Sequence, residues 1–209
     1  MDSTTPVFKK SNQGISSQRK DNHYLYTLVR RILLFLAITG LCNVARAEAF
    51  TIRSVETGLV NKVYTLSAQI EYQFSDAAIE ALQNGVPLLV LIDFKVEQER
   101  NWWLDKEIAE LQQGYWLLYH ALTEKYIVSN LNSGAQENYD SFNSAVHALG
   151  QLKALPILDA NLANKDKRYI VRLNTYLDLE ALPAPMRPLA YISSQWRLKS
   201  DWYEWPLQP

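Results

Sequence analysis

The chain is poor in cysteine, glycine and histidine, and each shortage excludes a class of protein. Its one cysteine, Cys42, precedes the segment in which we expect the folded domain, so that domain has neither a thiol nor a disulfide. It must fold on its hydrophobic core alone, unlike a disulfide-rich secreted domain. The seven glycines are scattered singly, and none belongs to a glycine-rich phosphate-binding loop. The sequence therefore predicts no cofactor.

Long hydrophobic runs are also lacking, apart from one near the N-terminus. Arg30 and Arg31 precede an apolar run of ten residues, 32–41, and Ala45 and Ala47 follow it. A positive flank, a short apolar run and a small-x-small site are the three parts of a secretory signal peptide, here with cleavage between Ala47 and Glu48. The run is too short to span a hydrocarbon core of about 30 Å comfortably. We expect a periplasmic protein, or an inner-membrane anchored one facing the periplasm if 30–47 is not cleaved.

The export signal leaves three alternatives open. The paired arginines also partly fit a twin-arginine signal, although they equally serve as the positive flank of any signal. A lipid anchor on Cys42 is disfavoured by Leu41, since a small residue is expected there. Residues 1–29 are rich in Ser, Asn and Gln, and we interpret them as a disordered basic leader or as the product of an upstream start.

Charge is distributed unevenly along the chain. The first 47 residues hold seven of the 21 basic residues and only two of the 22 acidic ones. The remaining 162 residues, 48–209, therefore carry 14 basic against 20 acidic side chains. An acidic domain is a poor partner for nucleic acid or anionic lipid, both of which need clustered Lys and Arg. We expect no nucleic-acid partner, and membrane contact only through 30–47.

Alternating polar and apolar residues dominate 48–209 and predict β-strands with one buried face. The runs that show this pattern are 50–55, 64–74, 88–96, 125–131, 169–179 and 191–199. Residues 108–122 are ambiguous, but their aromatic residues favour a strand. Gly58–Asn61 is expected to be the turn of a first hairpin. Leu88–Ile92 is apolar on both faces, which suggests a strand covered on both sides.

Two short helices are predicted between these strands. Ser75 is placed to cap a helix over 76–84, and Asp140 or Ser141 to cap one that ends at Gly150. The two surroundings are similar enough to suggest a duplicated strand–helix–strand unit around 64–96 and 126–177. We therefore expect a mostly β (α+β) fold. It would be a β-sandwich-like single domain over 48–209, with about seven to eight antiparallel strands and two short helices, after an N-terminal signal or anchor helix.

A proline-rich segment, Leu182–Pro188, lies between the last two predicted strands. Its prolines favour a stiff extended connector at an edge or end of the sheet. The functional alternative, a proline-rich ligand for the groove of another protein, is less favoured because strands are expected on both sides.

No residue pattern predicts a catalytic or metal site. His120 and His147 are the only histidines after residue 48, and they lack metal-ligand spacing or a nucleophile in a recognisable context. Carboxylates are numerous between Asp93 and Glu110, but no pair stands out as an acid and a base. We therefore predict no catalytic, cofactor-binding or metal residues.

Tryptophan and tyrosine supply the candidates for an interaction surface, because they offer large contact areas with a polar group. Trp116 and Trp196 are more typical of a core in a domain without disulfides. For the others the core and the interface explain the sequence about equally well. The candidate interaction residues are Trp102, Trp103, Trp202, Tyr203 and Trp205.

Several motifs resemble one known family. They are Trp102-Trp103-Leu104-Asp105, the segment from Tyr115 to Thr123, Ala148-Leu149-Gly150, the Leu-Pro-x-Pro element at 182–185 and Trp196-Arg197-Leu198-x-Ser200-x-Trp202. Together they resemble the bacterial domain of unknown function 4390 family, across almost all of 48–209. Met186 stands where Leu is expected. The resemblance implies an exported or membrane-attached proteobacterial protein of no assigned activity, often encoded beside a membrane sensor kinase, and assigns no catalytic residues.

The sequence thus favours a non-catalytic periplasmic interaction domain over an enzyme. Its expected partner is an envelope or inner-membrane protein, such as the outward-facing part of a sensor kinase. The alternative is a small-ligand or glycan binder, or a cell-envelope hydrolase that uses carboxylates near Asp93–Glu110. A concave pocket with converging carboxylates and tryptophans would favour the alternative, and a convex aromatic patch would favour the partner.

Overall fold

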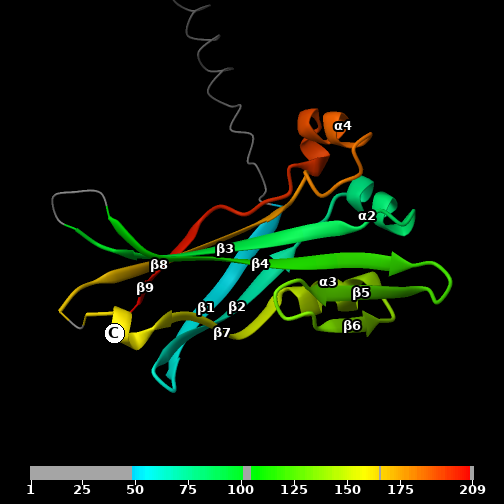
Figure 1. Cartoon of the computed structure of the whole chain (residues 1–209). Coiled ribbons are helices and arrows are strands. Elements are labelled where there is room, and N and C mark those ends of the chain that lie inside the picture. The colour runs from blue at the N-terminus through cyan, green and yellow to red at the C-terminus, as the bar shows by residue number, and fades with distance from the viewer. Residues whose placement is uncertain (1–48, 101–104, 165, 208–209) are drawn as a thin grey trace, which may run out of the picture. The chain divides into compact units, whose positions relative to one another are not determined.

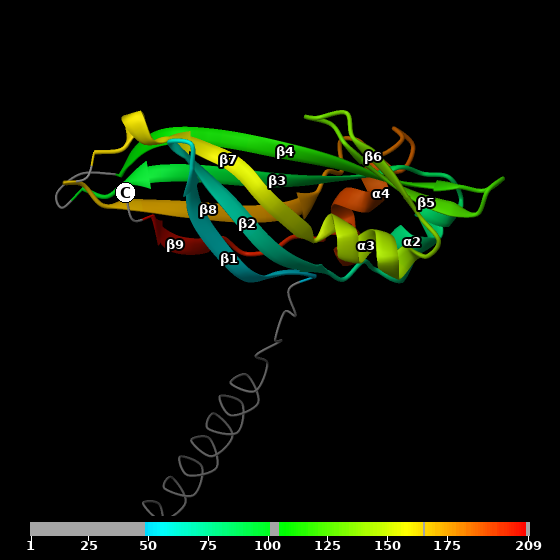
Figure 2. The same cartoon turned by 90° about the horizontal axis from the view of Figure 1, so that it is seen from below.

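The computed structural model describes residues 49–100, 105–164 and 166–207. These residues form nine strands in two antiparallel sheets, with three α-helices (Figure 1). Sheet A has the order β1-β2-β7 and sheet B the order β6-β5-β4-β3-β8-β9. The two sheets pack against each other over one hydrophobic core, and the strands of sheet A run obliquely to β3 and β4 of sheet B (Figure 2). The predicted mostly β fold is confirmed, whereas the expected N-terminal signal or anchor helix lies outside the described residues.

Sheet A joins segments from two distant parts of the chain: β1 (Phe50–Val60), β2 (Val63–Tyr72) and β7 (Gln151–Asp159). The turn between β1 and β2 consists of Asn61 and Lys62, which both have positive φ. Such two-residue turns match the right-handed twist of a hairpin. The predicted turn at Gly58–Asn61 is therefore displaced, since β1 continues through Gly58 to Val60.

Sheet B is built on β3 (Leu88–Gln98) and β8 (Tyr169–Leu177), which pair in register along their length. Next to β3 lie β4 (Lys106–His120), β5 (Lys125–Asn130) and β6 (Gln136–Tyr139), and β9 (Tyr203–Leu207) lies on β8. Alternation puts one set of side chains toward sheet A. The set from β3 is almost completely buried: Leu88, Val90, Ile92, Phe94 and Val96.

Both predicted helices are present. Ser75 caps α2 (Asp76–Gln83), its hydroxyl accepting a hydrogen bond from the backbone N–H of Ala78. Ser141 caps α3 (Phe142–Leu149), and Gly150 ends it. α2 leads from sheet A to sheet B, and α3 leads from sheet B back to sheet A. A helix flanked by strands thus occurs at both places, and the duplication itself stays a prediction.

The predicted strand at 191–199 is wrong. Its first residues end α4 (Arg187–Ile192), and Ser194–Trp196 is a turn of 3₁₀ helix, η2. Ile192 is 79% exposed, whereas Trp196 and Leu198 are buried. Only Lys199 pairs with a strand, through a single bridge to Tyr176.

The predicted extended connector at Leu182–Pro188 is also wrong. Residues 184–186 form a turn, and Pro188 lies in the first turn of α4, where its missing N–H would have no helical partner anyway. Arg187 closes the segment on itself by donating from Nε to the carbonyl of Leu182 at 2.8 Å.

A buried hydroxyl network ties the two sheets together. Thr175 on β8 is fully buried and donates from Oγ1 to the carbonyl of Leu91 at 3.0 Å. Because that hydroxyl has only one proton, the Tyr72 hydroxyl of β2, 3.2 Å away, must donate to Thr175. The backbone N–H of Thr175 donates to the Ser200 hydroxyl at 3.0 Å. The segment after η2 is therefore attached to the same point of the core.

Candidate functional site

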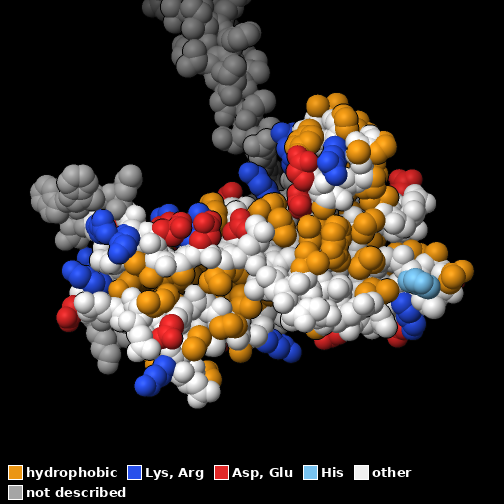
Figure 3. Space-filling model, in the orientation of Figure 1, with side chains coloured by type: hydrophobic (Ala, Val, Ile, Leu, Met, Phe, Trp, Pro, Cys, Tyr) orange, Lys and Arg blue, Asp and Glu red, His pale blue; other side chains and the backbone are white. Residues whose placement is uncertain are grey.

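The outer face of sheet B, the face that points away from sheet A, is divided into a charged half and an apolar half. Figure 3 looks at this face and shows acidic and basic side chains along β3 and β8, with hydrophobic ones gathered below α4. Strand pairing explains the division, because residues opposite one another across neighbouring strands share a face. Lys95 of β3 thus lies beside Glu110 of β4 and Arg172 of β8.

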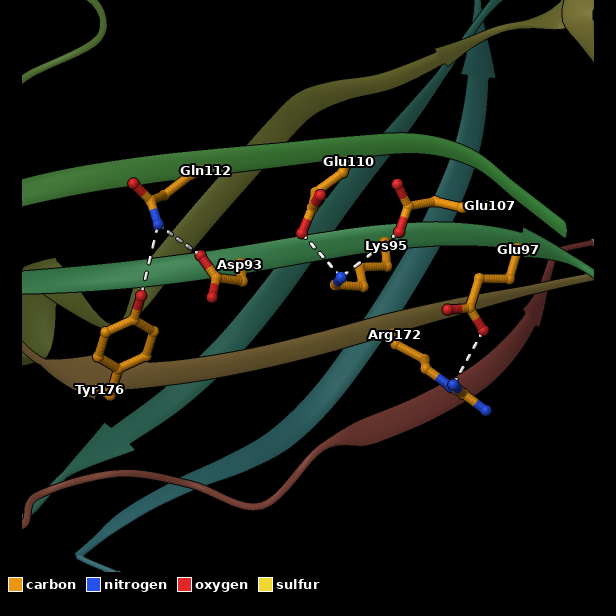
Figure 4. Close-up of polar contacts among 8 residues, drawn as sticks. All are labelled: Asp93, Lys95, Glu97, Glu107, Glu110, Gln112, Arg172 and Tyr176. Atoms are coloured by element: carbon orange, nitrogen blue, oxygen red, sulfur yellow. Dashed lines mark hydrogen bonds and ion pairs between the residues drawn. The ribbon is translucent and has the colours of Figure 1, made fainter. Parts of the chain in front are cut away.

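Five carboxylates and two basic groups make up the charged half, which we call the carboxylate stripe. The Lys95 ammonium lies 2.8 Å from Glu110 Oε1 and 3.4 Å from Glu107 Oε2 (Figure 4). Arg172 lies 2.9 Å from Glu97 Oε2 through Nη1, and 2.7 Å from Glu204 Oε1 through Nε. The fifth carboxylate, Asp93, accepts from Gln112 Nε2 at 2.8 Å. The members of the stripe are Asp93, Lys95, Glu97, Glu107, Glu110, Arg172 and Glu204.

Two groups in or beside the stripe have raised pKa values. The hydrogen bond that the Lys95 ammonium donates to Glu110, with further attraction from Glu107, raises the pKa of Lys95 above its usual value. Partial burial, followed by the charge of Asp93, raises the pKa of the neighbouring Tyr176 phenol. With five carboxylates and two cations, the stripe carries a surplus of negative charge.

The apolar half of the outer face, which we call the apolar patch, lies toward the opposite end of β4. The hairpin pairing puts its side chains on the same face as the stripe. Gly114 shows how closely they pack, since a Cβ at that position would lie 2.8 Å from Leu131 Cδ1 and 3.4 Å from Leu91 Cδ2. Leu131 remains 52% exposed, and the others are half-buried. The patch consists of Leu91, Trp116, Leu118, Ile127 and Leu131.

The structure separates the candidate interaction residues named from the sequence. Trp202 is 43% exposed. Tyr203 and Trp205 are half-buried and pair with Leu173 and Val171, whose side chains belong to the core, so they lie on the inner face at the sheet edge. Their rings pack against each other with centroids 6.2 Å apart. Trp102 and Trp103 lie outside the described residues, as do Ala45, Ala47 and Glu48 of the cleavage site.

Alternation along β4 puts His120 on the same face as Leu118, next to the apolar patch, whereas His147 belongs to α3. His120 is exposed at the end of β4, where Nδ1 lies 2.9 Å from the Thr123 hydroxyl. His147 is exposed on α3. Within the described ranges, no group of three His, Cys, Asp or Glu residues is arranged to hold a metal ion.

A small cavity lies on the other side of sheet B, between the inner face of β4, β5 and β6 and the C-terminal end of α3. Its volume is about 170 Å³. Its polar groups come from Tyr115, Asn130, Glu137, Tyr139 and Gln151, and the apolar remainder from Val128, Ala135, Ala148 and Leu149. The Tyr139 hydroxyl donates to Glu137 Oε2 at 2.5 Å. The cavity contains one carboxylate and no tryptophan, so the carboxylates near Asp93–Glu110 do not converge on it.

Sequence reasoning missed most of the apolar patch and all of the cavity. The apolar patch had one signal, the run Leu88–Ile92 that is apolar on both faces of a strand. Nothing in the sequence pointed to the cavity, because it forms where β6, a short polar strand, meets α3. Among the described residues, the structure contains no helix with the length and hydrophobicity to cross a bilayer.

Comparison with known protein families gives one match. A family model described as "Domain of unknown function (DUF4390)" matches residues 47–206, which include every strand of both sheets except the last residue of β9. The chain matched no curated protein and no solved structure.

Proposed function

We propose that this chain, which belongs to the DUF4390 family, is a non-catalytic interaction domain of the bacterial cell envelope that binds a protein partner through the outer face of sheet B. The observation that carries the proposal is the apolar patch beside the carboxylate stripe (Figure 3). Large apolar side chains that stay exposed on a sheet and are bordered by polar groups are typical of protein interfaces.

The charges beside the patch indicate the chemistry of the partner. The stripe has five carboxylates for two cations, so a surface with surplus Lys and Arg is complementary to it. Such complementarity selects the partner and speeds association more than it increases affinity. We infer a partner with an apolar centre and a basic margin on one side.

The hydrolase alternative has less support. The carboxylates of the stripe lie on an open sheet face, where Lys95, Arg172 and Gln112 contact them (Figure 4). Glycoside hydrolysis requires two carboxyl groups on either side of a bound sugar, one of them held protonated. Ionised groups in mutual ion pairs suit a charged rim better.

The site of action is proposed from the N-terminal segment. Its positive flank, apolar run and small residues favour export, which gives the domain access to other envelope proteins. The family resemblance suggests the outward-facing part of a sensor kinase as the first partner to test.

Site-specific photocrosslinking in living cells tests the proposed surface. A photoreactive residue is placed at Leu131 of the patch or, as a matched control, at Leu162 on η1 (Ala160–Leu162) after β7, a leucine of similar exposure. We expect a discrete protein adduct from position 131 and none from position 162. Equal adducts from both positions, or no adduct from 131, would refute the proposed surface.

Affinity for the crosslinked partner then separates the two halves of the surface. Leu131→Glu puts a charge into the patch and should weaken binding about tenfold or more, whereas Leu162→Glu should change it less than about twofold. Glu110→Gln should slow association and reduce its dependence on salt, with a smaller effect on dissociation. Loss of binding in the Leu162 variant would show that the interface lies elsewhere.

A further inference from the structure

The cavity under α3 combines a carboxylate with tyrosines and with the end of a helix. Tyr115 comes from β4 and Tyr139 from β6, so the two rings reach the cavity from either side of β5. Glu137 is the only charged residue in the lining. Among the described residues, the ring-to-ring contacts form one chain from Phe50 through Phe142 to Tyr119 and a separate pair, Tyr203 and Trp205, and they include neither of these two tyrosines.

Three features of the lining favour positive charge. The Glu137 carboxylate supplies a full negative charge, and its hydrogen bond from Tyr139 holds it beside the cavity. Tyrosine rings attract cations through their negative faces. Ala148 and Leu149 form the last turn of α3, and the C-terminus of a helix carries partial negative charge from its free carbonyls.

Within the part of the chain that the structure describes, no basic side chain lines the cavity. Lys125, on the neighbouring β5, is bound to Asp140 instead. His147, the only titratable residue of α3, is exposed and does not line the cavity. The negative features of the lining are therefore left for a ligand.

Size and polarity narrow the class of ligand. A cavity of about 150 Å³ is known to hold one benzene molecule, so about 170 Å³ accommodates a molecule of roughly six to eight non-hydrogen atoms. Val128, Ala135 and Leu149 make part of the wall apolar, which suits alkyl groups better than a hydrated metal ion. We propose that this cavity is a binding site for a small organic ammonium ion, with Glu137 as its counter-ion and Tyr115 and Tyr139 as its aromatic walls.

The site is independent of the proposed partner surface, because its side chains lie on the inner face of sheet B and the apolar patch lies on the outer face. Gly150 fixes the C-terminal end of α3, which forms one wall of the cavity. Its carbonyl accepts from the N–H of Ile70 on β2 at 2.9 Å, which fixes the end of α3 against sheet A.

Ligand-observed NMR with the full chain tests the site. The probe is choline, and its control is 3,3-dimethylbutan-1-ol, which has the same shape with carbon in place of the charged nitrogen. We expect saturation transfer to the N-methyl protons of choline and at least about fivefold weaker binding of the neutral alcohol. Equal binding of both compounds, or no binding of choline at millimolar concentration, would overturn the proposal.

Substitutions connect the signal to this cavity. Glu137→Gln keeps the shape and removes the charge, and should weaken choline binding about fivefold or more. Tyr139→Phe keeps the ring and should change binding less than about threefold, whereas Tyr139→Ala should abolish it. Glu107→Gln, which removes an exposed carboxylate from the outer face, is the matched control and should leave binding unchanged. If Glu107→Gln reduces binding as much as Glu137→Gln, the cation is bound by general surface charge and the proposal fails.

Discussion

The hydroxyl network between β2 and β8 makes a quantitative prediction about stability. Tyr72 donates to Thr175, and Thr175 donates to the carbonyl of Leu91, all away from solvent. Tyr72→Phe removes the first donor and leaves the second hydrogen bond intact, so we expect it to lower the free energy of unfolding by about 0.5–1.5 kcal/mol.

Removing the acceptor of this hydrogen bond should lower the free energy of unfolding more than removing its donor. Thr175→Val is close to isosteric, but it leaves the Tyr72 hydroxyl buried without an acceptor. That loss is worth about 1–3 kcal/mol. In the double variant Tyr72→Phe/Thr175→Val no hydroxyl is left without a partner. Its cost should therefore fall below the sum of the single costs by about 0.5–3 kcal/mol.

Urea unfolding of the four proteins, followed by tryptophan fluorescence, measures these values. Trp196 is buried and reports on the core. At this size, about 1 kcal/mol corresponds to a shift of roughly 2–4 °C in Tm, so thermal unfolding gives an independent check. The reasoning is refuted if Tyr72→Phe proves more costly than Thr175→Val, or if the two costs simply add.

Two further predictions concern Gly150, which follows α3 beside the cavity, and Tyr139 in the cavity wall. In Gly150→Ala the new Cβ would lie 2.0 Å from the carbonyl oxygen of Ile70, so we expect urea unfolding to show a free energy of unfolding lower by about 1–3 kcal/mol. Gly58→Ala, whose Cβ would meet nothing closer than 3.6 Å, is the control and should change it little. Equal effects of the two substitutions would mean that α3 can shift freely. Burial, and then the Glu137 carboxylate, raises the pKa of Tyr139 to about 12. Its neutral phenol therefore stabilises the fold fully below about pH 10, and this contribution is lost as pH rises toward 12. NMR titration of ring-labelled tyrosine should show the Tyr139 pKa falling in Glu137→Gln while staying above 10, and an unchanged pKa would contradict the contact.

Local patterns were sufficient to predict the strands with one buried face. β2, β3, β5 and β8 alternate clearly, and the caps Ser75 and Ser141 were visible because a hydroxyl before a helix has a local function. The same rule failed at 191–199, where the chain forms the end of a helix and a 3₁₀ turn, so that Ile192 is exposed and only Trp196 and Leu198 are buried. The alternation of these three apolar residues is therefore a coincidence.

The strands that were missed have their pattern interrupted. β7 contains Pro156 and a positive φ at Ala154, and its pairing with β2 shifts register twice. β9 contains Pro206, which an edge strand tolerates because one side of its backbone needs no partner. These strands owe their place to tertiary pairing, which no local window contains.

The candidate surfaces were harder to predict than the fold. Aromatic residues were singled out as a class, but the sequence does not say which face of a strand they occupy, and Trp116 was expected in the core. Tyr203 and Trp205 turn inward, whereas Trp116 faces outward with Leu91 and Leu131. The cavity depends on an approach of β6 to α3 that only the folded chain shows.

The strand order of sheet A has a consequence for how the domain folds. Its central strand, β2, is complete at Tyr72, yet the neighbour on its second edge, β7, begins only at Gln151. A chain that emerges N-terminus first, from a ribosome or across a membrane, presents β2 as an open edge of a two-stranded hairpin until β7 follows. Unpaired edges invite pairing with other chains. Polar residues alternate along β2 and therefore help to keep the hairpin soluble before β7 pairs with it. They are Thr65, Ser67, Gln69 and Glu71.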